Sequence, residues 1–244
     1  MTPACPGLRS FFALALSLAL VFTPFSPAFT QIASEAELNE AIDAQESPLK
    51  FGAGVITFSG EKIITYSTSL LGHVNGGSIL DGGNTVRLFY VDGDYLSNIT
   101  GLIVQNGAAP GSNAGGRGGA IYVYDNLSGN IAGSTFSKNS ASGTGNYSGQ
   151  GGAIYANGDL TLSADSASAW FKGNQAGATP NAIYLANSGG NKTASLSAGS
   201  GHTMYFYDPI QSTTAPGLTI KINPDGASTG TVRFDGNYTR LRPH

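Results

Sequence analysis

Gly118-Gly119-Ala120-Ile121-Tyr122 and Gly151-Gly152-Ala153-Ile154-Tyr155 are two copies of one short stretch. Two later stretches have diverged from it: Asn181-Ala182-Ile183-Tyr184 lacks the glycines, and Gly201 to Asp208 follows the order of Gly118 to Asp125. Repeats with a period of about 20–50 residues are typical of a solenoid, in which each unit stacks on the next. The units contain only short strand-like runs between Gly, Asn and Ser turns. The sequence therefore predicts an all-β solenoid, a β-helix.

Equivalent positions of the copies are predicted to form columns inside the β-helix. Side chains alternate between the two faces of a strand, and burying one large apolar side chain contributes about 1.5–3 kcal/mol. A second inward column is predicted to start with Phe136 and Phe171. Asn139 and Asn174 are expected at equivalent turns, where their side chains pass hydrogen bonds between units. The first predicted inward column consists of Ile121, Ile154, Ile183 and Met204.

The N-terminal segment, positions 1–30, has the pattern of a signal peptide. Arg9 precedes an apolar run from Phe11 to Phe22, and Pro24 and Pro27 follow. A membrane anchor is the alternative, but a span needs about 20 apolar residues. The single cysteine, Cys5, lies in this segment, so no disulfide is expected after cleavage. We predict an exported protein of the cell outer membrane, the cell surface or the extracellular space.

The remaining chain, residues 31–244, is predicted to be a single β-helix domain, and its composition excludes several classes of partner and of fold. The net charge is −3 and only 11% of residues are charged, so neither a nucleic acid nor an anionic membrane is an expected partner. The 35 glycines have no period of three and alternate with aliphatic strands, which excludes collagen and disorder. Early rungs are expected in residues 54–105, the motif repeats in 106–210 and the C-terminal rungs in 211–244.

A short helix is predicted at the start of this domain, over residues 34–45. Ser34 and Glu37 have the spacing of a capping box, and apolar residues such as Leu38 and Ala41 follow. A solenoid needs its first rung covered because an open strand edge invites further pairing. The helix is therefore interpreted as an N-terminal cap, with an unattached leader helix as the alternative.

The pairing of Gly-Gly-Ala-Ile with Phe-x-x-Asn resembles the passenger repeats of the polymorphic outer-membrane proteins, which are of autotransporter type. The resemblance covers about residues 101–210, and Met204 to Ile210 is similar to the aromatic-Asp-Pro-Ile segment that closes such tracts. It implies an extracellular right-handed parallel β-helix that serves adhesion or surface display, without catalytic residues. The matched residues are Gly118 to Ile121 with Phe136 and Asn139, and Gly151 to Ile154 with Phe171 and Asn174.

The chain departs from that pattern after Asp208. An autotransporter carries a membrane barrel of at least about eight strands, each of about 9–11 residues, and the remaining residues are too few to supply it. A soluble released passenger, a partner of a separate outer-membrane transporter and a truncated structural passenger without a ligand therefore stay open as alternatives.

Binding is predicted at loops and at an aromatic stripe. The loops Gly107 to Arg117 and Ser140 to Gln150 are expected side by side at one edge, either as binding loops that include Arg117 and Tyr147 or as plain spacers. With Ile inward, tyrosines point outward, and their hydroxyls are expected in water, ready to contact a host-cell glycan or protein. Stacking that only stabilises the sheet is the alternative. The predicted stripe consists of Tyr122, Tyr124, Tyr155, Tyr184, Tyr205 and Tyr207.

A β-helix polysaccharide lyase or hydrolase is the enzymatic alternative to this non-enzymatic interpretation. Such enzymes need clustered carboxylates as acid–base pairs or Ca²⁺ ligands. Asp92 and Asp94, with Asp81 and Arg87 in neighbouring runs, are the best candidates, but an Asp pair beside glycine is typical of a turn. The histidines His73, His202 and His244 have no partner at catalytic or metal-site spacing. No catalytic residue, metal or small-molecule cofactor is therefore predicted.

Overall fold

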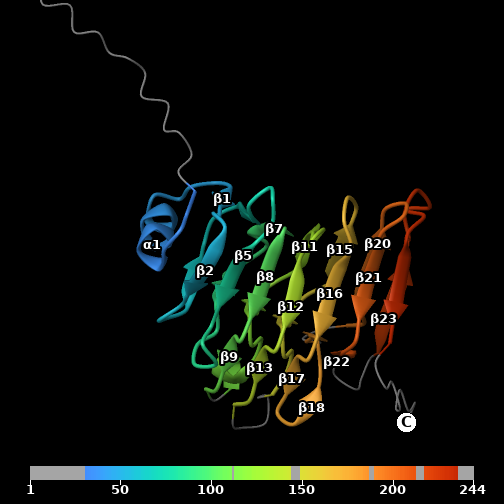
Figure 1. The fold of residues 1–244 in the computed structure, drawn as a ribbon. Helices are drawn as coiled ribbons and strands as arrows, with labels where there is room; N and C mark the ends of the chain where they lie inside the picture. The colour runs from blue at the N-terminus through green and yellow to red at the C-terminus, as the bar shows by residue number, and fades with distance from the viewer. Residues whose placement is uncertain (1–30, 112, 144–148, 187–189, 213–216, 236–244) are drawn as a thin grey trace, which may run out of the picture. The chain divides into compact units, whose positions relative to one another are not determined.

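The computed structural model describes residues 31–111, 113–143, 149–186, 190–212 and 217–235 (Figure 1). The predicted signal peptide, residues 1–30, and the loop residue Tyr147 lie outside the described residues. No helix in the described part of the chain is long and apolar enough to cross a membrane. One α-helix, α1 (Glu35–Asp43), precedes a succession of short strands in the described residues.

The strands form three long stacks, which the chain visits in turn to make each rung. Sheet 1 has two parts, β1 (Leu49–Lys50), β4 (Thr68–Leu71) and β7 (Leu96–Thr100), then β11 (Leu127–Asn130), β15 (Leu160–Ala164), β20 (Lys192–Ala198) and β23 (Leu218–Ile222). Sheet 2 has β2 (Gly54–Thr57), β5 (Ser78–Asp81), β8 (Leu102–Gln105), β12 (Thr135–Ser137), β16 (Ala169–Lys172), β21 (Thr203–Phe206) and β24 (Thr231–Phe234). Sheet 3 has β3 (Lys62–Ile64), β6 (Phe89–Val91), β10 (Ile121–Val123), β14 (Ile154–Ala156), β19 (Ile183–Leu185) and β22 (Ile210–Ser212).

A smaller stack, sheet 4, lies between sheets 2 and 3 in chain order. It contains β9 (Ala108–Ala109), β13 (Ser140–Ala141), β17 (Gln175–Ala176) and β18 (Thr179–Pro180), and the 3-10 helix η1 (Asn113–Gly116) follows β9. Strand pairs in all three long sheets are parallel, and each strand lies next to its counterpart one rung away, as in β10–β14 and β12–β16. The predicted parallel β-helix is therefore confirmed.

The two parts of sheet 1 meet where β11 passes β7. A Cβ atom on Gly129 would lie only 1.3 Å from the carbonyl oxygen of Ser97, so a residue with a side chain does not fit there without a backbone shift. Asn98 bridges the same junction, because its Oδ1 accepts a hydrogen bond from the Asn130 backbone N–H at 3.0 Å. The glycine allows the backbones to approach, and the asparagine satisfies a donor at this junction.

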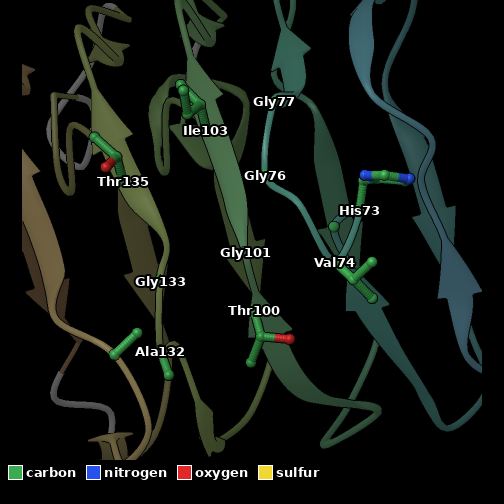
Figure 2. A pocket seen from close by; sticks show the side chains of 12 residues that line it. His73, Val74, Gly76, Gly77, Thr100, Gly101, Ile103, Ala132, Gly133 and Thr135 are labelled. Atoms are coloured by element: carbon green, nitrogen blue, oxygen red, sulfur yellow. The ribbon is translucent and has the colours of Figure 1, made fainter.

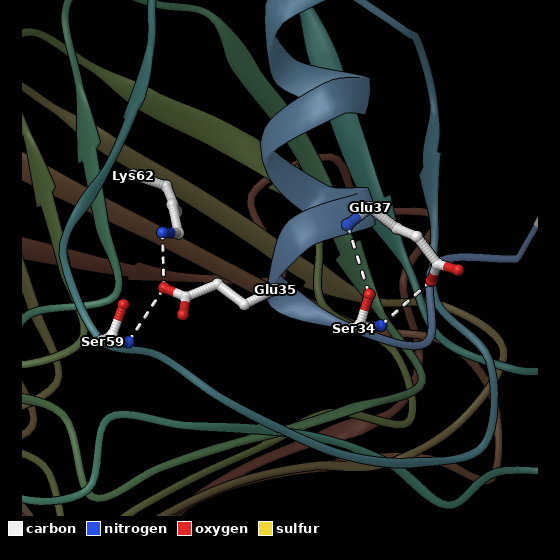
Figure 3. Close-up of polar contacts among 5 residues, drawn as sticks. All are labelled: Ser34, Glu35, Glu37, Ser59 and Lys62. Atoms are coloured by element: carbon white, nitrogen blue, oxygen red, sulfur yellow. Dashed lines mark hydrogen bonds and ion pairs between the residues drawn. The ribbon is translucent and has the colours of Figure 1, made fainter.

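Helix α1 is the predicted cap, and it is slightly shorter at both ends than the predicted range 34–45. Ser34 Oγ accepts from the Glu37 N–H at 3.2 Å, and Glu37 Oε2 accepts from the Ser34 N–H at 3.1 Å (Figure 3). This reciprocal pair is the capping box that the sequence predicts. Leu38 and Ala41 are buried in the same apolar core as the strands. The helix therefore belongs to the domain, and the unattached leader helix is excluded.

An ion pair joins the cap to the first strand of sheet 3. Glu35 Oε1 accepts hydrogen bonds from Lys62 Nζ at 2.5 Å and from the Ser59 N–H at 2.8 Å (Figure 3). Lys62 pairs in register with the buried Phe89, so its stem lies at the end of an inward column while its charge reaches the helix. Burial opposes ionisation of Glu35, but the hydrogen bonds from Lys62 and Ser59 outweigh it and lower its pKa to about 2.

Replacing Glu35 with Gln is expected to lower the free energy of unfolding by about 1 kcal/mol at pH 7, as for a partly exposed charge-assisted pair. The pKa of Glu35 is depressed in the folded state, so its contribution is fully present above the unfolded value of about 4.5 and is lost as pH falls toward about 2. Urea titrations of the wild type and Glu35→Gln at pH 7, 4 and 2.5 measure this difference. A difference that stays constant across that range contradicts the assignment.

The predicted inward column of sheet 3 is confirmed for its three isoleucines, but the prediction is wrong for Met204. Ile121 pairs with Ile154, and Ile154 with Ile183, and all three are fully buried. The next place belongs to Ile210, which pairs with Ile183. Met204 lies in sheet 2, where it is buried opposite Ala169. After Ile183 the chain forms β20 in sheet 1 and β21, with Met204, in sheet 2, and it returns to sheet 3 only at Ile210.

A second column fills the interior beneath sheet 2. Phe136, Phe171, Phe206 and Phe234 stack with ring centroids 4.8, 4.8 and 5.3 Å apart, and the first three are fully buried. The column predicted from Phe136 and Phe171 is thus confirmed, and two further rungs extend it. Because phenylalanines lie one rung apart, their rings stack face to face. This stacking excludes water from the centre of the β-helix.

A ladder of buried side-chain hydrogen bonds runs beside the phenylalanines. Asn139 Nδ2 donates to Asn174 Oδ1 at 3.0 Å, and Asn174 Nδ2 donates to Asp208 Oδ2 at 2.9 Å. Each amide also serves the backbone, since Asn174 Nδ2 lies 3.0 Å from the Phe136 carbonyl oxygen. The predicted transfer of hydrogen bonds between units is confirmed, and Asp208 occupies the last place in this ladder.

Candidate functional site

The tyrosines that follow the inward residues of β6, β10, β14 and β19 form one stacked column. Tyr90, Tyr122, Tyr155 and Tyr184 have ring centroids 5.0, 4.9 and 5.9 Å apart and nearly parallel planes. Strand alternation directs these rings away from the isoleucines, as the sequence predicts. The expectation that their hydroxyls face water is wrong, because Tyr122, Tyr155 and Tyr184 are only 4, 2 and 9% exposed.

Two arginines lie over the rings of this column. Arg117 lies in an isolated parallel bridge with Gln150, and its guanidinium carbon is 5.0 Å from the Tyr155 ring centroid. Arg87 occupies the equivalent place over Tyr122, at 5.2 Å. Burial raises the pKa of Tyr155 to about 12, although the nearby charge of Arg117 acts in the opposite direction. The stacked rings and the two guanidinium groups thus form a layer of cation–π contacts on the outward side of sheet 3.

The predicted loop positions agree with the structure where the loops are described. The segments that open them, β9 and β13, pair in parallel, with Ser140 opposite Ala108, and β17 continues the same sheet. The loops therefore begin side by side on one edge, as predicted. Arg117 faces the tyrosine column, so its observed contacts are those of a residue that anchors its loop.

The remaining predicted tyrosines separate into two places. Tyr124 is 48% exposed in the turn after β10. Tyr205 does not continue the sheet 3 column; it pairs with Trp170 in sheet 2, and Gln211 takes the place opposite Tyr184. Tyr207, 42% exposed, lies just beyond Tyr205 in the chain.

The outward side of sheet 2 carries a column of mainly apolar and aromatic residues, interrupted by one threonine and ended by an arginine. Alternation places this column on the opposite face from Phe171 and its neighbours. The next outward residues along the same strands are more polar, such as Asp81, Gln105 and Lys172. Sequence reasoning missed this column, although the inward assignment of Phe171 implies an outward Trp170. In register order the column is Val55, Ile79, Ile103, Thr135, Trp170, Tyr205 and Arg233.

Aromatic and basic side chains meet at the C-terminal part of this column. The rings of Trp170 and Tyr205 are parallel within 3° at a centroid distance of 5.9 Å, and Tyr205 and Tyr207 are 6.2 Å apart. Arg233 pairs in register with Tyr205, and its Nε donates to Asp235 at 2.7 Å. This hydrogen bond and the neighbouring Tyr205 and Tyr207 raise the pKa of Arg233. We call these residues the aromatic–basic patch: Trp170, Lys172, Tyr205, Tyr207 and Arg233.

A hollow of about 520 Å³ adjoins the same column at the corner between sheets 1 and 2. Ile103 and Thr135 line one wall, and Val74 at the tip of the turn after β4 lies at the opposite side (Figure 2). The floor consists of small residues, including Gly101 and Gly133, which adopt positive φ of 67° and 72°. Since glycine alone takes this conformation without strain, the corner stays free of side chains.

Among the carboxylates considered for catalysis, Asp81 ends strand β5, whereas Asp92 and Asp94 lie in the turn after β6. Asp81 accepts hydrogen bonds from Gln105 and Asn106, and these bonds outweigh its burial and lower its pKa. Asp94 accepts from the backbone and side chain of Asn126 in the next rung. Among the described residues, no group of three or more His, Cys, Asp or Glu is placed to hold a metal ion.

A parallel β-helix with a capped N-terminal rung and an outward aromatic–basic patch is the class of protein that these features define. Its sequence is similar to probable outer membrane proteins of Chlamydia pneumoniae. The similarity to pmp6 is 42% identity over 117 residues, 45% of this chain and 7% of that protein. The similarity to pmp8 is 36% over 133 residues, covering 49% and 14%, and that to pmp2 is 38% over 89 residues, covering 33% and 11%.

These similarities confirm the resemblance to the repeats of polymorphic outer-membrane proteins, and the relatives' names agree with the predicted outer-membrane or cell-surface location. The chain spans between 7 and 14% of the length of these three relatives. No family model matches the chain. No solved structure matches it either.

Proposed function

We propose that this chain is an exported, non-enzymatic β-helix module that acts in adhesion at the cell surface. The observation that carries the proposal is the aromatic–basic patch on sheet 2. Trp, Tyr and Arg are the residues that most often dominate binding energy at protein interfaces. An outward sheet face that meets only water is usually polar, whereas here Trp170 and Tyr205 stack on it and Tyr207 is 42% exposed.

The scaffold beneath the patch suits such a role. Trp170 and Tyr205 alternate along their strands with Phe171 and Phe206, which are fully buried in the phenylalanine column. The outward rings are thereby held on rigid strands, so that little side-chain freedom is lost when a ligand binds. The relatives, whose names place them in the outer membrane, support a surface location.

The absence of enzymatic activity is part of the proposal. Hydrolysis or elimination at a sugar needs two carboxyl groups, or a carboxyl group and a base, that face one substrate. Asp81 and Asp94 are instead held by hydrogen bonds to side chains of the following rungs, Asn106 and Asn126.

Attachment to cultured epithelial cells tests the proposal. The purified chain labelled with a fluorophore is expected to bind, and the triple variant Trp170→Ser, Tyr205→Ser, Tyr207→Ser is expected to bind at least about 10-fold more weakly, because its anchoring rings are removed. The matched control is Tyr95→Ser with Tyr124→Ser, which removes two exposed rings outside the patch. Circular dichroism verifies that both variants keep the fold. Equal attachment of a folded triple variant and wild type overturns the proposal.

A further inference from the structure

The outward column of sheet 2 and the hollow beside it form one continuous track. Ile103 and Thr135 line the hollow, and Thr135 pairs in register with Trp170, the first residue of the aromatic–basic patch. Tyr205 and Arg233 follow on the next two strands. Neighbouring strands are about 4.8 Å apart, so the track from Ile103 to Arg233 is about 19 Å long and runs across the rungs.

We propose that this track binds a linear acidic polysaccharide that lies across the rungs of sheet 2. The inference rests on the proposed function and names the ligand class of the same patch. A sugar ring has C–H faces that pack against apolar surface and hydroxyl edges that form hydrogen bonds. Trp170 and Tyr205 offer the apolar side, while the Thr135 hydroxyl in the hollow and the Tyr207 hydroxyl offer the polar side.

Charge selects an acidic chain. Lys172 is exposed two residues after Trp170 on the same strand, Arg233 is exposed next to Tyr205 on the following strand, and Lys138 is exposed one rung before Lys172. Asp235 is the carboxylate next to them, and it engages Nε of Arg233. Since a guanidinium has five N–H donors, this pair leaves Arg233 able to hold a second anion. In residues 31–105, by contrast, acidic residues outnumber basic ones, so anions are favoured only toward the C-terminal rungs.

The size of the track favours a single polymer chain over a protein partner. A stable protein interface buries about 800 Å² on each partner. A track about 19 Å long and two outward side chains wide offers roughly a quarter of that area. A linear polymer needs no flat surface, since it gains affinity from repeated contacts along its length. A second copy of this chain is a poor fit for the same reason, and because Lys172 and Arg233 would meet like charges.

Isothermal titration calorimetry with three defined polymers tests the proposal. Heparin oligosaccharides carry sulfate and carboxylate groups, polygalacturonate carries carboxylates alone, and dextran is neutral. We expect at least one acidic polymer to bind, with an affinity that falls as salt rises, and dextran to bind at least about 10-fold more weakly. Binding of heparin alone assigns sulfate as the recognised group. Binding of polygalacturonate assigns carboxylate.

Variants separate the track from general attraction to basic residues. Lys172→Gln with Arg233→Gln is expected to weaken binding about 10- to 100-fold, and Trp170→Ala with Tyr205→Ser about 10-fold. Tyr205→Phe, which keeps the ring, should retain most of the affinity. The matched control, Lys192→Gln with Lys221→Gln, removes the same charge from sheet 1 and is expected to change affinity by less than about 2-fold.

Three outcomes overturn the inference: neither acidic polymer binds, dextran binds equally well, or the control pair weakens binding as much as Lys172→Gln with Arg233→Gln. Cell attachment that depends on the patch without any acidic polymer binding refutes the polysaccharide and leaves the adhesive function standing. Polymer binding at the track with cell attachment unchanged in the triple variant refutes the adhesive function and leaves the ligand class standing.

Discussion

Phe171→Ala is expected to lower the free energy of unfolding by about 3–5 kcal/mol, as for other buried phenylalanines that leave a cavity. Phe171 lies in the middle of a stack, 4.8 Å from the ring of Phe136 on one side and 4.8 Å from that of Phe206 on the other. Its side chain is fully buried. The strands on either side are hydrogen-bonded in register, so they cannot close together around the missing ring. Urea unfolding followed by circular dichroism measures the loss.

The neighbouring residue supplies the control for this substitution. Trp170→Ala removes a larger side chain from the same strand, but from the outward face, and is expected to reduce stability by only about 1 kcal/mol through its contact with Tyr205. A comparable loss for both variants would show that the phenylalanine column is not the principal core of sheet 2.

Asn174→Ala is the second large effect, expected to reduce stability by about 2–4 kcal/mol. The Asn174 side chain accepts from Asn139 Nδ2 at 3.0 Å, and it donates to the Phe136 carbonyl at 3.0 Å and to Asp208 at 2.9 Å. Truncation leaves these groups buried and short of partners, including a carboxylate, which is more costly than losing a hydrogen bond in water. Thermal and urea unfolding of the variant measure the change.

Asn98→Ala is the matched control for the asparagine ladder. Asn98 also bonds to the next rung, through the Asn130 N–H, but it is half-buried where water can replace it. Its loss is expected to stay below about 1 kcal/mol. The ladder hypothesis fails if the two substitutions destabilise the protein equally. Asp208→Asn, which keeps one acceptor oxygen, should lie between them.

Much of the fold is predictable because each repeat carries its own local signals. The strands at Ile121 and Ile154 follow directly from the repeated motif. The phenylalanine column follows from its Phe-x-x-Asn spacing. The asparagine ladder follows because a buried amide needs partners and an identical amide lies one rung away. The helix cap follows from Ser34 and Glu37, whose spacing alone defines a capping box.

The misplacement of Met204 and Tyr205 has a specific physical cause. Alternating aromatic and apolar residues look the same on any strand, so a local match cannot tell which of three sheets the strand joins. That depends on how many strands the chain has formed since the previous motif. The rung that begins at Ile183 returns to sheet 3 only at Ile210. Met204 precedes that return and lies on the strand before it, in sheet 2.

The burial of the tyrosine column also lies beyond local pattern. Alternation predicts correctly that Tyr122 and Tyr155 point away from the isoleucines. It does not reveal that Arg87 and Arg117 lie over their rings. These contacts join residues that are distant in sequence. The outward direction of Trp170 and Tyr205 is easier to predict from the sequence. Each of them directly precedes an inward phenylalanine, Phe171 or Phe206, and successive side chains of a strand point to opposite faces.

The register of the columns has a consequence for how the gene can change. The segment 121–153 starts and finishes at equivalent places, because Ile121 lies opposite Ile154. An in-frame duplication of this segment would set isoleucine on isoleucine, phenylalanine on phenylalanine and asparagine on asparagine. Deleting it would join the same kinds of partners in sheet 3, but in sheet 1 it would put Leu162 in the place of Gly129, where a side chain meets the Ser97 carbonyl oxygen. Duplication of this segment therefore lengthens the coil while its interior chemistry stays the same, and surface loops are free to diversify independently of that change.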